Sequence, residues 1–66
     1  MDAKHPAIHV QLSGENGNVF NIIAIVSNAL KRAGEVKAAK DFRSRAMAAK
    51  SYDEVLRLCI ETVDVS

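Results

Sequence analysis

The chain has 66 residues and a net charge of +1, with 48% apolar and 26% charged residues. This composition is typical of a folded domain rather than a disordered segment, and the length allows one domain only. A single cysteine excludes an intrachain disulfide, and one cysteine with two histidines cannot complete a four-ligand structural zinc site, so we expect no metal or other cofactor.

Membrane insertion and secretion are also unexpected. The longest apolar run, residues 22–26, is far too short to cross a bilayer. The first residues lack the basic segment and long apolar core of a secretory signal. We therefore expect no membrane association and a cytoplasmic, reducing location.

The first expected element is a strand over residues 7–12. Apolar residues alternate there with polar ones, as in a strand with one buried face, over Ile8, His9, Val10, Gln11 and Leu12. Residues 1–6 are expected to be a flexible N-terminus that Pro6 ends. The domain is therefore expected to span residues 7–66.

A turn and a long apolar helix follow. Asn18 is a good N-cap, and Gly34 is the expected left-handed stop, which places the helix at residues 19–33. Its apolar residues cover more than half of the circumference, and they are Val19, Phe20, Ile22, Ile23, Ile25, Val26, Ala29, Leu30 and Ala33. Because so apolar a helix must be covered on two sides, we expect it to be the central helix.

Two more helices and a strand complete the chain. The alanine-rich residues 35–49 predict a helix whose inner stripe is Val36, Ala39, Phe42, Ala46 and Ala49. Ser51 and Glu54 form a capping box before a helix over 52–61. The apolar face of that helix is Val55, Leu56, Cys59 and Ile60. Alternation over residues 62–65 predicts a short last strand.

The expected fold is a small α+β domain of two short strands and three helices in the order β-α-α-α-β. If each element reverses direction, the strands run the same way and can pair in parallel. Two strands make a poor sheet and leave open edges. We therefore predict a homo-oligomer, with a dimer as the first expectation, formed through a strand edge or the surplus apolar face of the first helix.

Four short motifs follow one another between residues 8 and 65. They are a G-E-[DN]-G-N-x-F turn, a helix ending A-L-[KR]-[KR]-A-G, a Y-D-x-[VL]-L segment and a V-x-V end. The matching residues are Gly14, Glu15, Gly17, Asn18, Phe20, Ala29, Leu30, Lys31, Arg32, Ala33, Gly34, Tyr52, Asp53, Leu56, Val63 and Val65. In these motifs the chain resembles a set of short uncharacterised bacterial and phage-associated proteins. The resemblance implies a compact folded unit of mobile-element origin and carries no mechanism.

The turn is the first candidate site. It offers Glu15, Asn16, Gly17 and Asn18 to a partner, because exposed loops often carry recognition. Amides at a helix start attract anions, so a phosphate or nucleotide ligand is an alternative. Glu15 would repel an anion, however, and the glycine spacing is not that of a dinucleotide fingerprint. A glycine bend followed by a helix cap explains the same residues without any ligand.

A basic face is the second candidate site. Residues 31–50 hold seven basic and two acidic residues, a net +5, whereas residues 51–66 carry a net −3. The candidate basic residues are Lys31, Arg32, Lys37, Lys40 and Arg43. They suit nucleic-acid phosphates, but no aromatic residue is interleaved to stack on bases. A solvated helix face, or a contact with the acidic terminus of another subunit, also explains them.

No nucleophile, base and orienting group can be assembled from this sequence, and Cys59 is expected to be an inert core residue. We therefore expect no enzyme. The expected function is a non-catalytic protein-binding module that acts as a homo-oligomer, as a phage or mobile-element protein that occupies a host protein. The alternatives are a protein that sequesters a phosphate-containing or nucleotide ligand, and a nucleic-acid-binding accessory protein.

Overall fold

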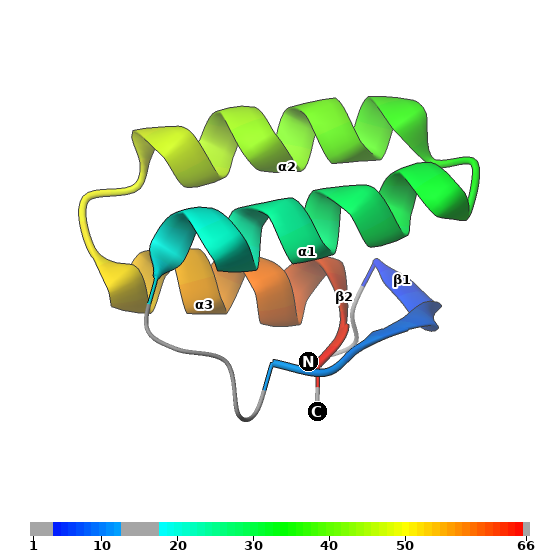
Figure 1. Ribbon diagram of the computed structural model, residues 1–66, viewed down its shortest axis with the longest axis horizontal. Helices are drawn as coiled ribbons and strands as arrows, with labels where there is room; N and C mark the ends of the chain where they lie inside the picture. The colour runs from blue at the N-terminus through cyan, green and yellow to red at the C-terminus, as the bar shows by residue number, and fades with distance from the viewer. Residues whose placement is uncertain (1–3, 13–17, 66) are drawn as a thin grey trace.

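Three helices and two short parallel strands form the α+β fold that the sequence predicts (Figure 1). The computed structural model describes residues 4–12 and 18–65. The elements in chain order are β1 (His5–Val10), α1 (Val19–Arg32), α2 (Val36–Ala48), α3 (Tyr52–Thr62) and β2 (Val63–Val65). Helix α1 packs against α2, α3 and β1, so its predicted central place is confirmed.

The two strands pair in parallel, as the alternating directions of the elements favour. His5 lies opposite Val63 and Val10 lies opposite Val65, with an irregularity in β1 between these points. The strand begins at His5, two residues before the predicted domain boundary, and it ends at Val10 rather than at Leu12. Pro6 is accommodated within the strand because a proline, which lacks an amide hydrogen, fits where the ladder is interrupted.

The helix ends follow the capping chemistry of the sequence. Asn18 Oδ1 accepts a hydrogen bond from the Phe20 amide at 2.9 Å, which caps α1. Gly34 has a φ of +84°, and its amide donates to the Lys31 carbonyl at 3.0 Å. The next amide, that of Glu35, donates to the Leu30 carbonyl at 2.8 Å. These two bonds form a Schellman motif, so the turn between α1 and α2 is fixed by local hydrogen bonds.

The cap of α3 differs from the predicted box in one bond. Ser51 Oγ accepts from the Glu54 amide at 3.2 Å, as expected. The Glu54 carboxylate, however, accepts from the amide of Lys50 at 3.0 Å rather than from that of Ser51. The reciprocal bond reaches one residue further back than in a capping box, so the bonded backbone amides at the start of α3 are those of Lys50 and Glu54.

The core lies between the three helices and the sheet. Its buried side chains are Val10, Ile22, Ile23, Val26, Leu30, Ala39, Phe42, Ala46, Val55, Cys59 and Val63. Three residues assigned to inward faces are exposed instead, namely Phe20, Val36 and Ile60. Ala33 is also exposed, because it lies at the end of α1 beyond the last helical turn. A chain this small has too few neighbours to cover every apolar side of its helices.

Candidate functional site

The first candidate site, the turn before α1, falls mostly outside the described residues. This applies to Glu15, Asn16 and Gly17. Asn18 is described, is exposed and caps α1 through its side chain. Capping of α1 is therefore a structural role that Asn18 fills in the described part of the turn.

The second candidate site, the basic face, is exposed along its whole length. It consists of Lys31, Arg32, Lys37, Lys40 and Arg43. The first two occupy the last turn of α1, and Lys37 begins α2 directly after the Gly34 turn. Within the described part of the chain, none of the five has a carboxylate oxygen within ion-pair distance. Their charge is therefore available to a partner.

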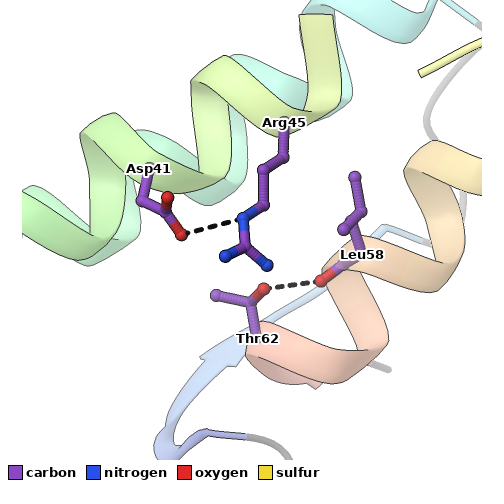
Figure 2. A network of polar contacts seen from close by, with 4 residues as sticks. All are labelled: Asp41, Arg45, Leu58 and Thr62. Atoms are coloured by element: carbon purple, nitrogen blue, oxygen red, sulfur yellow. Dashed lines mark hydrogen bonds and ion pairs between the residues drawn. The ribbon is translucent and has the colours of Figure 1, made fainter. Parts of the chain in front are cut away.

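Arg45 does not belong to this face. Its Nε lies 3.1 Å from an Asp41 carboxylate oxygen one helical turn away (Figure 2). The side chain points toward the last turns of α3, where Thr62 Oγ1 donates to the Leu58 carbonyl at 2.6 Å. Asp41, Arg45, Leu58 and Thr62 line one small cavity of about 50 Å³ between α2 and α3. The positive charge of Arg45 is thus directed away from the basic face.

A groove that the sequence reasoning did not foresee lies where three helix ends meet. The N-terminal end of α1, the C-terminal end of α2 and the N-terminal end of α3 converge at one side of the molecule (Figure 1). The groove has a volume of about 430 Å³. We call it the anchor groove, and it is lined by Val19, Phe20, Ile23, Ala46, Met47, Ala49, Lys50, Ser51, Tyr52 and Val55.

Several large apolar side chains around the anchor groove are exposed to solvent. The exposed fractions are 63% for Phe20, 56% for Met47 and 43% for Tyr52. Five large apolar side chains are exposed in the described part of the chain, so most of them gather at this one hollow. Clustered apolar exposure of this kind marks an interaction surface, whereas isolated exposed residues need no explanation.

The sequence held only a partial signal for this groove. Met47 follows Lys40 and Arg43 at helical spacing, so it lies away from the stripe of Ala39 and Phe42 that faces the core. Phe20 was expected to be buried, which is wrong, because the neighbours of α1 cover its other side. The meeting of three helix ends depends on tertiary packing and could not be read from local patterns.

A second hollow flanks α1 on its other side. It has a volume of about 420 Å³ and is formed by β1 and the C-terminal half of α1. Ile8, Ile25 and Ala29, which line it, are only half-buried. Close by, His9 Nδ1 lies 2.6 Å from an Asp64 carboxylate oxygen across the parallel strands, with both side chains exposed. Helix α1 is therefore left partly uncovered on two sides.

The only thiol of the chain is held in the core. Cys59 has no exposed surface. Burial raises the pKa of its thiol to about 11, and a backbone hydrogen bond lowers the pKa by a smaller amount. A protonated, buried thiol is a poor nucleophile. Over residues 4–12 and 18–65, no three His, Cys, Asp or Glu side chains are grouped so that they could hold a metal ion.

None of the helices in the described part of the chain combines the length and the apolar character needed to cross a membrane. Comparison with known proteins found no matching family model, no matching curated protein and no matching solved structure.

Proposed function

We propose that this chain is a non-catalytic protein-binding module whose binding site is the anchor groove. The observation that carries the proposal is the gathering of Phe20, Met47 and Tyr52, all well exposed, around one hollow of about 430 Å³. A hollow of this size, with an apolar lining, accepts an aromatic or aliphatic side chain of a partner. The resemblance to phage-associated proteins supports a host protein as that partner.

The anchor groove suits a protein better than a small anionic ligand. The first turn of α3 carries the acidic residues Asp53 and Glu54 beside the groove, and these repel an anion. Lys50 is the one basic residue of the groove lining, and its exposed ammonium group is an adaptable contact rather than a fixed one. Apolar burial is therefore the main source of affinity that the groove offers.

The groove proposal is tested by comparing variants against one purified partner. Wild-type protein serves as bait in a host lysate, and a captured protein is then purified and its Kd measured. Replacing Phe20 and Met47 together with serine is expected to raise the Kd at least about tenfold, because truncating anchors at an interface centre costs about 2 kcal/mol or more. The matched control is Ile60→Ser, which removes an equally exposed apolar side chain, 55% exposed, outside the groove.

Two results would count against the groove. One is that no captured protein binds wild type saturably once it is purified. The other is that the double variant binds as tightly as Ile60→Ser. Circular dichroism of each variant checks the fold, which is expected to be kept because both groove side chains are largely exposed.

We also propose that the module acts as a homo-oligomer through the hollow between β1 and α1. Half-buried Ile25 and Ala29 there leave apolar surface that a second copy would cover, and β1 has only β2 as a strand neighbour among the described residues. A two-fold contact would join the same surface of both copies.

Sedimentation equilibrium is expected to give a mass of twice 7.2 kDa. Ala29→Glu places a charge in the proposed contact and is expected to restore the monomer, whereas Ala24→Glu, on the opposite face of α1, is not. A wild-type chain that remains at 7.2 kDa at the highest soluble concentration would contradict the proposed homo-oligomer.

A further inference from the structure

The anchor groove continues into a stripe along α2. Val36, Lys40, Arg43 and Met47 follow one another at intervals of four, three and four residues, so they share one face of the helix. All four are exposed, and none lies in the buried stripe of α2. We call this face the α2 stripe. It begins with an apolar residue, has two cations in the middle and ends at Met47 in the groove.

Helix geometry sets the spacing of these groups. With a rise of about 1.5 Å per residue, Arg43 lies about 6 Å and Lys40 about 10 Å from Met47 along the axis, and Val36 about 16 Å. A ligand that fills the groove at Met47 would therefore meet two cations and then a second apolar side chain, Val36, which is 48% exposed. A single ion cannot span this distance.

The neighbouring helix α1 extends the same surface. Helices α1 and α2 lie side by side and run in opposite directions (Figure 1). Phe20 of α1 and Met47 of α2 line the same groove. One turn after Phe20, α1 presents the exposed Ala24, whose small side chain adds little bulk to this face. Lys31, eleven residues after Phe20 on this face, is also exposed and lies about 16 Å along α1, at the Val36 end of α2. Lys40 and Arg43 of α2 thus lie between two ends, of which one is the anchor groove and the other carries Val36 and Lys31. We call this exposed surface of the two helices the track.

We propose that the occupant of this track is an acidic amphipathic helix of a partner protein. Its apolar anchor enters the groove, and acidic residues four and seven positions from the anchor face Arg43 and Lys40. A second apolar residue eleven positions away covers Val36. This is the helix-in-groove mode of recognition, with opposite charges fixing the register. The inference rests on the proposed protein-binding role of the anchor groove and specifies its partner.

Two other occupants fit the track less well. A nucleic acid would contact the cations but would leave Met47 and Val36, the apolar ends, uncovered. A second copy of α3 has Tyr52 as an anchor, but the positions four and seven residues later hold Leu56 and Cys59, which are not acidic. The charge pattern therefore favours an acidic helix from a different protein.

The test uses a synthetic helical peptide of about 18 residues, or five turns. It carries leucines at the anchor position and eleven residues later, and glutamates four and seven residues from the anchor. Tyr52 is the only tyrosine and the chain has no tryptophan, so its emission reports occupancy of the groove if the peptide lacks both residues. We expect saturable binding that weakens as salt rises.

Charge reversal tests the register. The pair Lys40→Glu and Arg43→Glu is expected to raise the Kd of the peptide at least about tenfold, and a peptide with lysines in place of the two glutamates is expected to restore binding to that variant. The matched control is Lys37→Glu, since Lys37 is also exposed on α2 but lies outside the stripe. We expect that control to change the Kd by less than about threefold.

The outcomes separate this inference from the function on which it rests. If the acidic peptide does not bind, or if the charge-swapped peptide does not rescue the variant, the acidic helix is refuted. A protein partner that still depends on Phe20 and Met47 would leave the groove proposal intact. A DNA or RNA duplex that binds more tightly than the peptide, and loses binding in the same charge-reversal variant, would assign the track to nucleic acid and overturn the inference.

Discussion

Replacing Leu30 with alanine is expected to lower the free energy of unfolding by about 2–5 kcal/mol. Leu30 lies in the last turn of α1, is fully buried and belongs to the hydrophobic core. A domain of this length has a total stability of about 3–10 kcal/mol, so the loss would remove much of it. Urea denaturation followed by circular dichroism measures the change as a shift of the midpoint at constant slope.

Phe20→Ala is the matched control for this substitution. It lies on the same helix and removes a larger side chain, but Phe20 is 63% exposed. We expect a cost of about 0.5 kcal/mol or less, as for most surface substitutions. If Phe20→Ala were as costly as Leu30→Ala, then Phe20 would belong to the core and the anchor groove would be closed in solution.

This pair of residues shows what the sequence could and could not predict. Both lie on a helix whose apolar residues cover more than half of its circumference, so a helical wheel assigns both to the interior. The wheel describes which side chains share a face, but it does not describe which faces have neighbours. The short chain covers one side of α1 well and leaves Phe20 outside.

Local chemistry, by contrast, was predicted well. The caps at Asn18 and Ser51 and the left-handed Gly34 each depend on hydrogen bonds or backbone angles within a few residues, and the structure confirms all three. The order of the elements followed from these predicted helix beginnings and ends. The sequence allowed parallel pairing of the strands but did not decide it, and the structure shows that they are parallel.

Contacts between distant segments were not predictable in the same way. The alternation rule placed His9 and Asp64 on outward faces of their strands, where both are exposed. Their side-chain contact at 2.6 Å depends on the register of the two strands, which no local pattern defines. The same holds for the anchor groove, whose walls come from three helices separated in sequence.

The candidate sites show the same difference between local patterns and contacts between distant segments. The cations of α2 were identified from the sequence because charge and helical spacing are local properties. Their relation to an apolar groove at one end of the helix became visible only in three dimensions, and this relation changes the interpretation. Cations alone suit a nucleic acid, whereas Lys40 and Arg43 between the exposed apolar residues Val36 and Met47 suit an amphipathic protein helix.

The stability of the fold is expected to fall as the pH rises from about 9 to about 11, because of Cys59. Its ordinary pKa is 9.0, and burial raises the pKa to about 11 in the folded chain. In this window the unfolded chain loses the thiol proton while the folded chain keeps it. The unfolded state therefore binds fewer protons, and linkage requires the free energy of unfolding to decrease with pH. At about 1.4 kcal/mol per pKa unit, the decrease is on the order of 2–3 kcal/mol.

Denaturation of wild type and Cys59→Ala at a series of pH values isolates this contribution. The alanine variant loses a buried sulfur and is expected to be less stable at neutral pH, but its stability has no thiol-linked term. All other side chains are the same in the two proteins, so their contributions cancel in the difference. The stability advantage of wild type should therefore shrink as the pH rises through the window. A constant difference from pH 8 to about 11 would show that the thiol ionises as readily in the folded chain as in the unfolded one, and that α3 does not seal it in the core.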